Sequence, residues 1–433
     1  MNSKSSKQID SRGASNLTKP SRFHVDSLDG VRGFAILGGI AFHTLRPDEY
    51  RGFLGAIWRG LEETSWSGID LFFVLSGFLI TGILLDSRGR GGYFRNFYAR
   101  RTLRIFPLYY SVLLGVLVIV PAVIGLGRLP ALYAQLIKNQ IWLWTYLQNY
   151  LQSQSPHMLP GFGHFWSLAV EEQFYWVWPL VVYLLSRRNL MRLSLLICLV
   201  EPFLRFTLLQ YGYSTAALRQ LTFTRLDSLV YGGIAAIALR DSKVFPLVGH
   251  RGLRIIATLF GVVLLTILIR EGHIPYEGTA TVILGYSALG MLFSLLIYHL
   301  ASTQGTLSGI FSSGGLRWLG KYSYAIFVFQ WPVTLACSAI FNIHPGESSP
   351  SSVLFLFVAT IVLSGAIAYA SWNILEVRFM KLKRYFEYSQ ASPEVRNPRS
   401  ATAVLSAGQP TSLTVQLTPD VGLTADAPGQ EYR

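Results

Sequence analysis

Long apolar runs, separated by short polar and basic loops, dominate the chain. Ten of these runs approach the roughly 20 residues with which a helix crosses the hydrocarbon core of a bilayer. They cover residues 28–45, 68–86, 105–126, 164–185, 191–211, 226–240, 254–270, 279–300, 321–342 and 352–374. We therefore predict an all-α, polytopic integral membrane protein with about ten transmembrane helices.

A further stretch, residues 131–150, does not fit this description. It contains Lys138, Asn139, Gln140 and Gln148 among tryptophans and tyrosines. Aromatic residues of this kind are typical of the interface between membrane and water. We interpret the stretch as an interfacial or re-entrant segment and not as an eleventh span.

The two ends of the chain differ in composition from the apolar body. Residues 1–25 are polar and basic, and residues 386–433 are rich in Ser, Thr, Pro, Ala and Gly. A segment with so few large apolar side chains cannot bury enough surface to fold. We expect a basic N-terminal segment (1–25), a membrane domain (26–385) and a disordered tail (386–433).

The net charge of +14 is unevenly distributed. With the N-terminus inside, fifteen Lys and Arg residues fall in inner loops and seven to nine in outer loops or at span edges. Basic residues collect in the cytoplasmic loops of membrane proteins, so we expect a multi-pass protein of the inner (plasma) membrane with both termini cytoplasmic. We therefore expect the basic residues to lie near membrane lipid and do not expect them to bind nucleic acid.

The first apolar run carries an arginine near one end and a histidine near the other. Arg32 and His43 are 11 residues apart, which places them within about 20° on one helix face and about 16 Å apart along its axis. Ionisable groups are costly in lipid and mark candidate functional sites. The alternative is that Arg32 only reaches the headgroups while His43 caps the far end. Asp29, three residues before Arg32, is expected to pair with it and orient it.

Three acids in later runs are further candidates. Asp70 opens the second run, where it either caps the helix or serves the chemistry. His164 and Glu171, seven residues apart, are expected on one face. Glu171 and Glu172 point about 100° apart, so one can line an interior cavity while the other finds a different partner. We expect Arg225 to pair with Asp227 in an architectural role.

The densest basic stretch lies between the second and third runs and includes Arg100, Arg101 and Arg104. Arginine binds phosphate through two parallel hydrogen bonds, so this loop is a candidate phosphate site. Anionic lipid explains any basic inner loop equally well, and on charge alone we prefer that explanation. Only two cysteines occur, both in apolar runs, and no histidine spacing indicates a metal site.

Six motifs in register carry a family resemblance. They are LDGVRGFAILGGIAFH, GIDLFFVLSGFLIT, FYARRTLRIFPLYY, HFWSLAVEEQFYWVWPL, RLDSLVYGG and LGKYSYAIFVFQWPV. With them the chain resembles the acyltransferase 3 family of integral membrane acyltransferases, which includes bacterial O-antigen O-acetylases and macrolide acyltransferases. Two positions depart from the family pattern: Gln330 stands where a histidine is usual, and no proline follows Glu376.

The resemblance implies transfer of an acyl group from cytoplasmic acyl-CoA, expected to be acetyl-CoA, to a hydroxyl of a carbohydrate, with no bound cofactor or metal. The resemblance thus implies that Arg101 and Arg104 hold the CoA phosphates, with a weaker contribution from Arg100. His43, on the same face as Arg32, is the base or forms an acyl-histidine. Glu171 or Asp70 orients it.

His164 then shapes the acceptor pocket or shuttles a proton. A proton-coupled transporter is the rival function, because buried His, Arg and Glu also build proton relays. Affinity for CoA distinguishes the two functions, because a transporter has no need of it.

Overall fold

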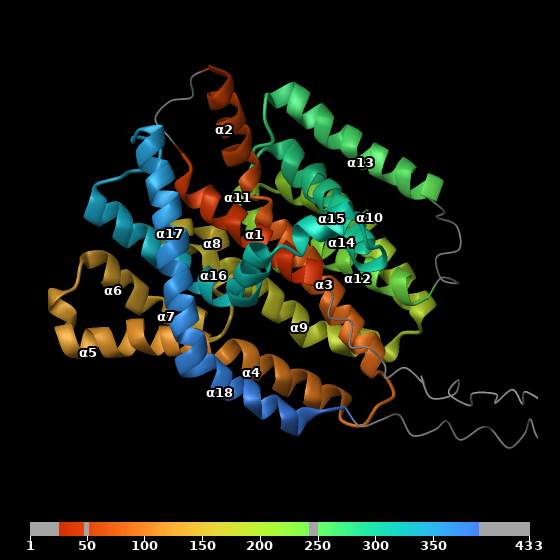
Figure 1. Cartoon of the computed structure of the whole chain (residues 1–433), viewed down its shortest axis with the longest axis horizontal. Coiled ribbons are helices and arrows are strands. Elements are labelled where there is room, and N and C mark those ends of the chain that lie inside the picture. The colour runs from red at the N-terminus through yellow and green to blue at the C-terminus, as the bar shows by residue number, and fades with distance from the viewer. Residues whose placement is uncertain (1–25, 47–51, 242–249, 389–433) are drawn as a thin grey trace, which may run out of the picture. The chain divides into compact units, whose positions relative to one another are not determined.

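Helices are the basis of the whole fold (Figure 1). The structure is a computed structural model that describes residues 26–46, 52–241 and 250–388, and every regular element within these ranges is a helix. The expected N-terminal segment (1–25) and all but the first three residues of the expected tail (386–433) lie outside the described residues.

Each of the ten apolar runs coincides with a helix. They are α1 (Asp26–Thr44), α3 (Gly68–Ser87), α4 (Tyr93–Leu114) with α5 (Val120–Ile124), α9 (Trp166–Leu184), α10 (Arg187–Gln210), α12 (Leu226–Arg240), α13 (His250–Glu271), α14 (Tyr286–Ser302), α16 (Gly314–Phe341) and α17 (Pro350–Ser371). Seven of the helical segments among the described residues are long and apolar enough to cross a membrane. The other three runs are α1, α9 and α12, which contain or adjoin several of the ionisable side chains that sequence analysis selected, such as Arg32, Glu171 and Asp227.

The remaining helices are short. They are α2 (Gly52–Ser65), α6 (Ala131–Lys138), α7 (Gln140–Trp144), α8 (Gln148–Gln154), α11 (Thr215–Gln220), α15 (Thr306–Phe311) and α18 (Val377–Lys381). Residues 131–150 therefore form α6, α7 and the start of α8, and none of these is long enough to span a bilayer. This agrees with the interpretation of the stretch as something other than an eleventh span.

Glycines bring the central helices into backbone contact. A Cβ added at Gly33 of α1 would collide with the carbonyl of Leu316 in α16, and one at Gly77 of α3 would collide with that of Leu229 in α12. Small residues allow such close approach, which is a main source of helix association in membranes. Helices α1 and α3 are thereby fixed against α16 and α12, and α1, α3 and α16 supply much of the candidate site.

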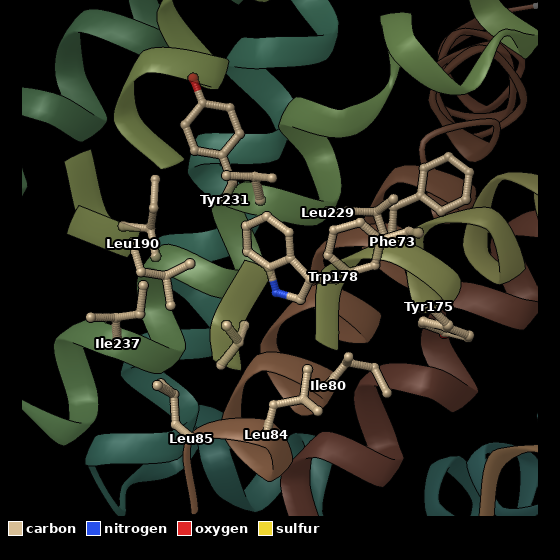
Figure 2. Packing of buried hydrophobic residues seen from close by; sticks show 14 of the residues in the cluster. Phe73, Ile80, Leu84, Leu85, Tyr175, Trp178, Leu190, Leu229, Tyr231 and Ile237 are labelled. Carbon is tan, nitrogen blue, oxygen red and sulfur yellow. The ribbon is translucent and has the colours of Figure 1, made fainter. Parts of the chain in front are cut away.

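The largest apolar cluster surrounds Trp178 of α9. Figure 2 shows its indole among side chains of α3, α10 and α12, which include Ile80, Leu190 and Leu229. The indole Nε1 donates a hydrogen bond to Thr81 Oγ1 at 2.9 Å, so the one polar atom of this ring has a partner in the apolar cluster. Helix α9, which carries the two glutamates, is held in place by this packing.

A buried network of charges joins α3, α10, α12 and α14. Arg225 binds Asp70, and both side chains are at most 2% exposed. Arg205 Nη2 lies 2.8 Å from Asp227 Oδ2, with both side chains 0% exposed, and the hydroxyl of Ser287 donates to the same carboxylate oxygen at 2.6 Å. Each buried arginine therefore has an acidic partner, as burial away from water requires.

This network corrects two sequence predictions. Arg225 pairs with Asp70 and not with Asp227, because Asp227 is bound by Arg205 from α10. Asp70 lies in the first turn of α3, but Ser67 occupies the cap position, and the Asp70 carboxylate accepts from Arg225 and from Ser228 Oγ at 3.3 Å. The contacts of Asp70 are thus those of a helix-joining ion pair, and its role in orienting His43 stays a prediction.

Replacement of Asp70 should therefore reduce stability. Asp70→Asn leaves the Arg225 guanidinium buried without its counter-charge, and we expect a loss of about 3 kcal/mol in the free energy of unfolding. Asp86→Asn on the same helix is the control, since its bond to Arg240 involves a carboxylate that is 54% exposed and should be worth below about 1 kcal/mol. Thermal unfolding of the detergent-solubilised variants measures both. An Asp70→Asn protein as stable as the wild type would return Asp70 to the chemical candidates.

Candidate active site

Three cavities that share walls follow helix α1 through the protein. The largest, about 740 Å³, has Arg32, Arg101 and Arg104 in its lining, and a second of about 190 Å³ shares all three. The second shares Ile69, Phe72 and Phe327 with a third of about 10 Å³ that contains His43. We call them the cationic, acidic and histidine cavities. Arg32 and His43 thus face one line of cavities, as the helical spacing predicts.

The cationic cavity collects positive charge from four parts of the chain. Seven of its lining residues are basic, and Asp29, which binds Arg32, is the one acid among its lining residues. The basic residues are Arg32, Arg100, Arg101, Arg104, Arg317, Lys321 and Lys383. Such an excess of cations at close range is unfavourable unless an anion lies between them. The cavity therefore suits a ligand with several negative charges.

The acidic cavity contains both glutamates of α9. Glu171 Oε2 accepts a hydrogen bond from the Tyr175 hydroxyl at 3.3 Å, and that hydroxyl also contacts Ser76 of α3. Glu172 lines the same cavity, so the expectation that one of the two acids would find a different partner is wrong. Arg101 lies 4.3 Å above the Tyr175 ring, which places a cation from α4 beside the acids.

The histidine cavity joins three polar side chains from three elements. His43 of α1, His164 and Gln330 of α16 all line it, and the His43 ring lies 4.5 Å from that of Trp331. Both ring nitrogens of His164 and Oε1 of Gln330 are buried with no hydrogen-bond partner among the described residues. Buried polar atoms in this state are suited to bind an incoming polar group. Gln330, which departs from the family pattern, therefore lies beside the candidate base.

His164 does not share a helix face with Glu171. It lies in a 3-10 turn, Gly163–Phe165, and α9 begins only at Trp166, so the helical spacing does not extend back to it. The two residues accordingly line different cavities, His164 with His43 and Glu171 with Arg101. Among the described residues no group of three His, Cys, Asp or Glu side chains is arranged to hold a metal ion.

Several cavity residues were not identified by sequence reasoning. Tyr175 lies four residues after Glu171, one helical turn along, and that spacing could have indicated the contact. Arg317 and Lys321, also four residues apart, begin α16 and could have been found in the same way. Lys383 and Tyr388 lie near or beyond the expected start of the tail, where the sequence contains no comparable signal.

Comparison with known proteins shows that this chain is similar in sequence to bacterial O-acetyltransferases. Peptidoglycan O-acetyltransferase OatA of Listeria monocytogenes is 28% identical over 346 residues, which are 75% of this chain and 52% of that protein. The putative peptidoglycan O-acetyltransferase YrhL of Bacillus subtilis is 27% identical over 372 residues, 82% of this chain and 54% of that protein. O-acetyltransferase OatA of Staphylococcus aureus is 25% identical over 384 residues, 83% of this chain and 57% of that protein.

The chain spans about half the length of these curated relatives. No solved structure matches it. The sequence profile described as an acyltransferase domain matches residues 25–369, which include every helix that lines the acidic and histidine cavities. The chain therefore belongs to the acyltransferase 3 family of multi-pass membrane proteins.

Proposed function

We propose that this protein transfers an acetyl group from cytoplasmic acetyl-CoA to a hydroxyl of a cell-envelope glycan. The observation that carries the proposal is the line of cavities that leads from seven cations to His43. The relatives named as peptidoglycan O-acetyltransferases favour peptidoglycan as the acceptor and acetyl as the acyl group.

The distance along the line of cavities fits the length of this donor. The diphosphate and 3′-phosphate of CoA match the cationic cavity, because arginine binds phosphate with charge-assisted hydrogen bonds. The pantetheine arm has about as many bonds as four to five peptide residues, so it reaches roughly 15 Å when extended. The axial separation of Arg32 and His43, about 16 Å on an α-helix, is similar. A donor whose phosphates lie at Arg32 would therefore bring its thioester to His43.

The chemistry proposed for His43 is general base catalysis. The imidazole takes the proton of the acceptor hydroxyl as its oxygen attacks the thioester carbonyl carbon. The carbon–sulfur bond then breaks, and the leaving thiolate takes the proton back from the imidazolium. His164 and Gln330, whose polar atoms face the same cavity, are placed to hold the acceptor or the carbonyl oxygen. In the acidic cavity, Glu171 and Arg101 are proposed to position the arm of the donor.

Membrane orientation follows from the same assignment. The cationic cavity is lined by the start of α1, α4 and α16, and we place this side in the cytoplasm, where acyl-CoA is found and where basic residues collect. His43, near the end of α1, then lies toward the opposite face and the glycan.

Donor binding should depend on the arginines of α4. Arg101→Ala/Arg104→Ala removes two phosphate ligands, and we expect the affinity for acetyl-CoA to fall at least about 30-fold, since a hydrogen bond to a charged group contributes about 1.5–3 kcal/mol. Binding of labelled acetyl-CoA to protein in lipid nanodiscs measures this. The control is Arg187→Ala, which removes an arginine that pairs with Asp241 and lines none of the three cavities. An equal loss of affinity for acetyl-CoA in Arg187→Ala would contradict the donor assignment. Failure of the wild-type protein to bind acetyl-CoA would also contradict it and would favour a proton-coupled transporter.

Substitution of His43 should separate binding from chemistry. His43→Ala is expected to lower the rate of acetyl transfer by about 100-fold or more while the affinity for acetyl-CoA stays close to that of the wild type. The assay follows label from acetyl-CoA into a peptidoglycan or mixed glycan acceptor, together with release of CoA. His344→Ala, at an exposed site outside the cavities, is the control and should retain full activity. Undiminished transfer by His43→Ala would remove His43 from the mechanism.

A further inference from the structure

The C-terminal end of the described chain forms a strap across the cationic side of the protein. The strap is residues Leu382–Tyr388, a 3-10 turn (Leu382–Phe386) followed by Glu387 and Tyr388. It follows α18, which runs beside α4 in Figure 1, and it lies beyond the residues that the family profile matches.

Side chains of α4 hold the strap by its backbone. Arg100 Nη1 donates to the carbonyl oxygens of Lys383 at 3.4 Å and Phe386 at 3.3 Å, and Asn96 Nδ2 donates to that of Glu387 at 3.0 Å. Asn96 itself is buried. The strap is therefore fixed to the helix that carries Arg101 and Arg104, and its own side chains remain available to the cavities.

Two strap side chains face the cavities and two face away. Lys383 and Tyr388 are half-buried and line the cationic cavity, whereas Arg384 and Tyr385 are exposed and contact each other, with the guanidinium 4.8 Å from the ring centroid. The strap thus presents one cation and one aromatic ring inward and the same pair of residue types outward.

Tyr388 also lines a second cavity beside the cationic one. This side cavity, about 380 Å³, is lined by Arg90, Arg100 and Arg240 and by two acids, Glu387 and Asp86, of which Asp86 binds Arg240. It shares Arg100 and Tyr388 with the cationic cavity. An aromatic ring between two arginine-lined spaces suits a planar base linked to phosphates, because bases stack on aromatic side chains and guanidinium planes.

We propose that the strap is the nucleotide-binding wall of the donor site, in which Lys383 binds a phosphate and Tyr388 stacks on the purine ring of acyl-CoA. This inference rests on the proposed function and adds to it the residues that recognise the nucleotide half of the donor. The strap then distinguishes acyl-CoA from thioesters that lack the nucleotide.

The experiment compares inward and outward residues of the strap. The affinity for acetyl-CoA in nanodiscs, inhibition of binding by adenosine 3′,5′-bisphosphate, and thermal stability are measured for wild type, Lys383→Ala, Tyr388→Ala and Tyr388→Phe. The matched controls are Arg384→Ala and Tyr385→Ala. We expect Lys383→Ala and Tyr388→Ala to lose about tenfold in affinity for both ligands. Tyr388→Phe, which keeps the ring, and both controls should bind as the wild type does.

The outcomes separate this inference from the proposed function. If the wild type binds acetyl-CoA and the inward variants bind it equally well, the strap is not a nucleotide wall, although the donor assignment survives. If the outward controls lose as much affinity as the inward variants, the strap acts only through its fold and the inference fails. If the wild type binds neither acetyl-CoA nor the bisphosphate, the proposed function fails together with the inference.

Discussion

The free-energy cost of burying an ionisable side chain in an apolar helix bundle determines where the charged residues of this structure lie. Each charge must either pair with an opposite charge or face a cavity that a polar ligand or water can enter. Both solutions occur, and two sets of charged residues illustrate them. Arg205, Arg225, Asp70 and Asp227 are almost fully buried and paired across helices, whereas Arg32, Arg101, Arg104 and Glu171 line cavities. The first group joins the helices, and the second is available for chemistry.

The cavities give α1 a central role. Its glycines bring it against the backbone of α16, and its polar face meets the cationic cavity at Arg32 and the histidine cavity at His43. One helix therefore connects a site for anions with a site that contains a base. This arrangement suits a two-substrate transfer in which donor and acceptor approach from opposite ends and meet at one residue.

Local periodicity explains what could be predicted from the sequence. Each apolar run forms a helix, and the shared face of Arg32 and His43 follows from an uninterrupted α1. The same reasoning failed at His164, because a 3-10 turn precedes α9 and changes the direction of that side chain. Partners distant in sequence were not predictable: Asp70 and Arg225 are 155 positions apart. The strap was missed for the same reason, because its contacts with Asn96 and Arg100 join residues that are 291 and 283 positions apart.

The central claim is that the thiol end of CoA reaches the histidine cavity from the cationic one. Disulfide trapping tests it most directly, with Gln330→Cys in a chain whose Cys198 and Cys337 have been replaced by serine, incubated with CoA and a mild thiol oxidant. Mass spectrometry should then find one CoA attached to the cysteine at position 330. Little CoA should be attached when Arg101→Ala/Arg104→Ala is added to this protein. The same is expected of a control protein with Gly261→Cys in α13, away from the cavities, in place of Gln330→Cys. Absence of the adduct in protein that still binds CoA would contradict the claim, as would equal labelling with and without the two arginines.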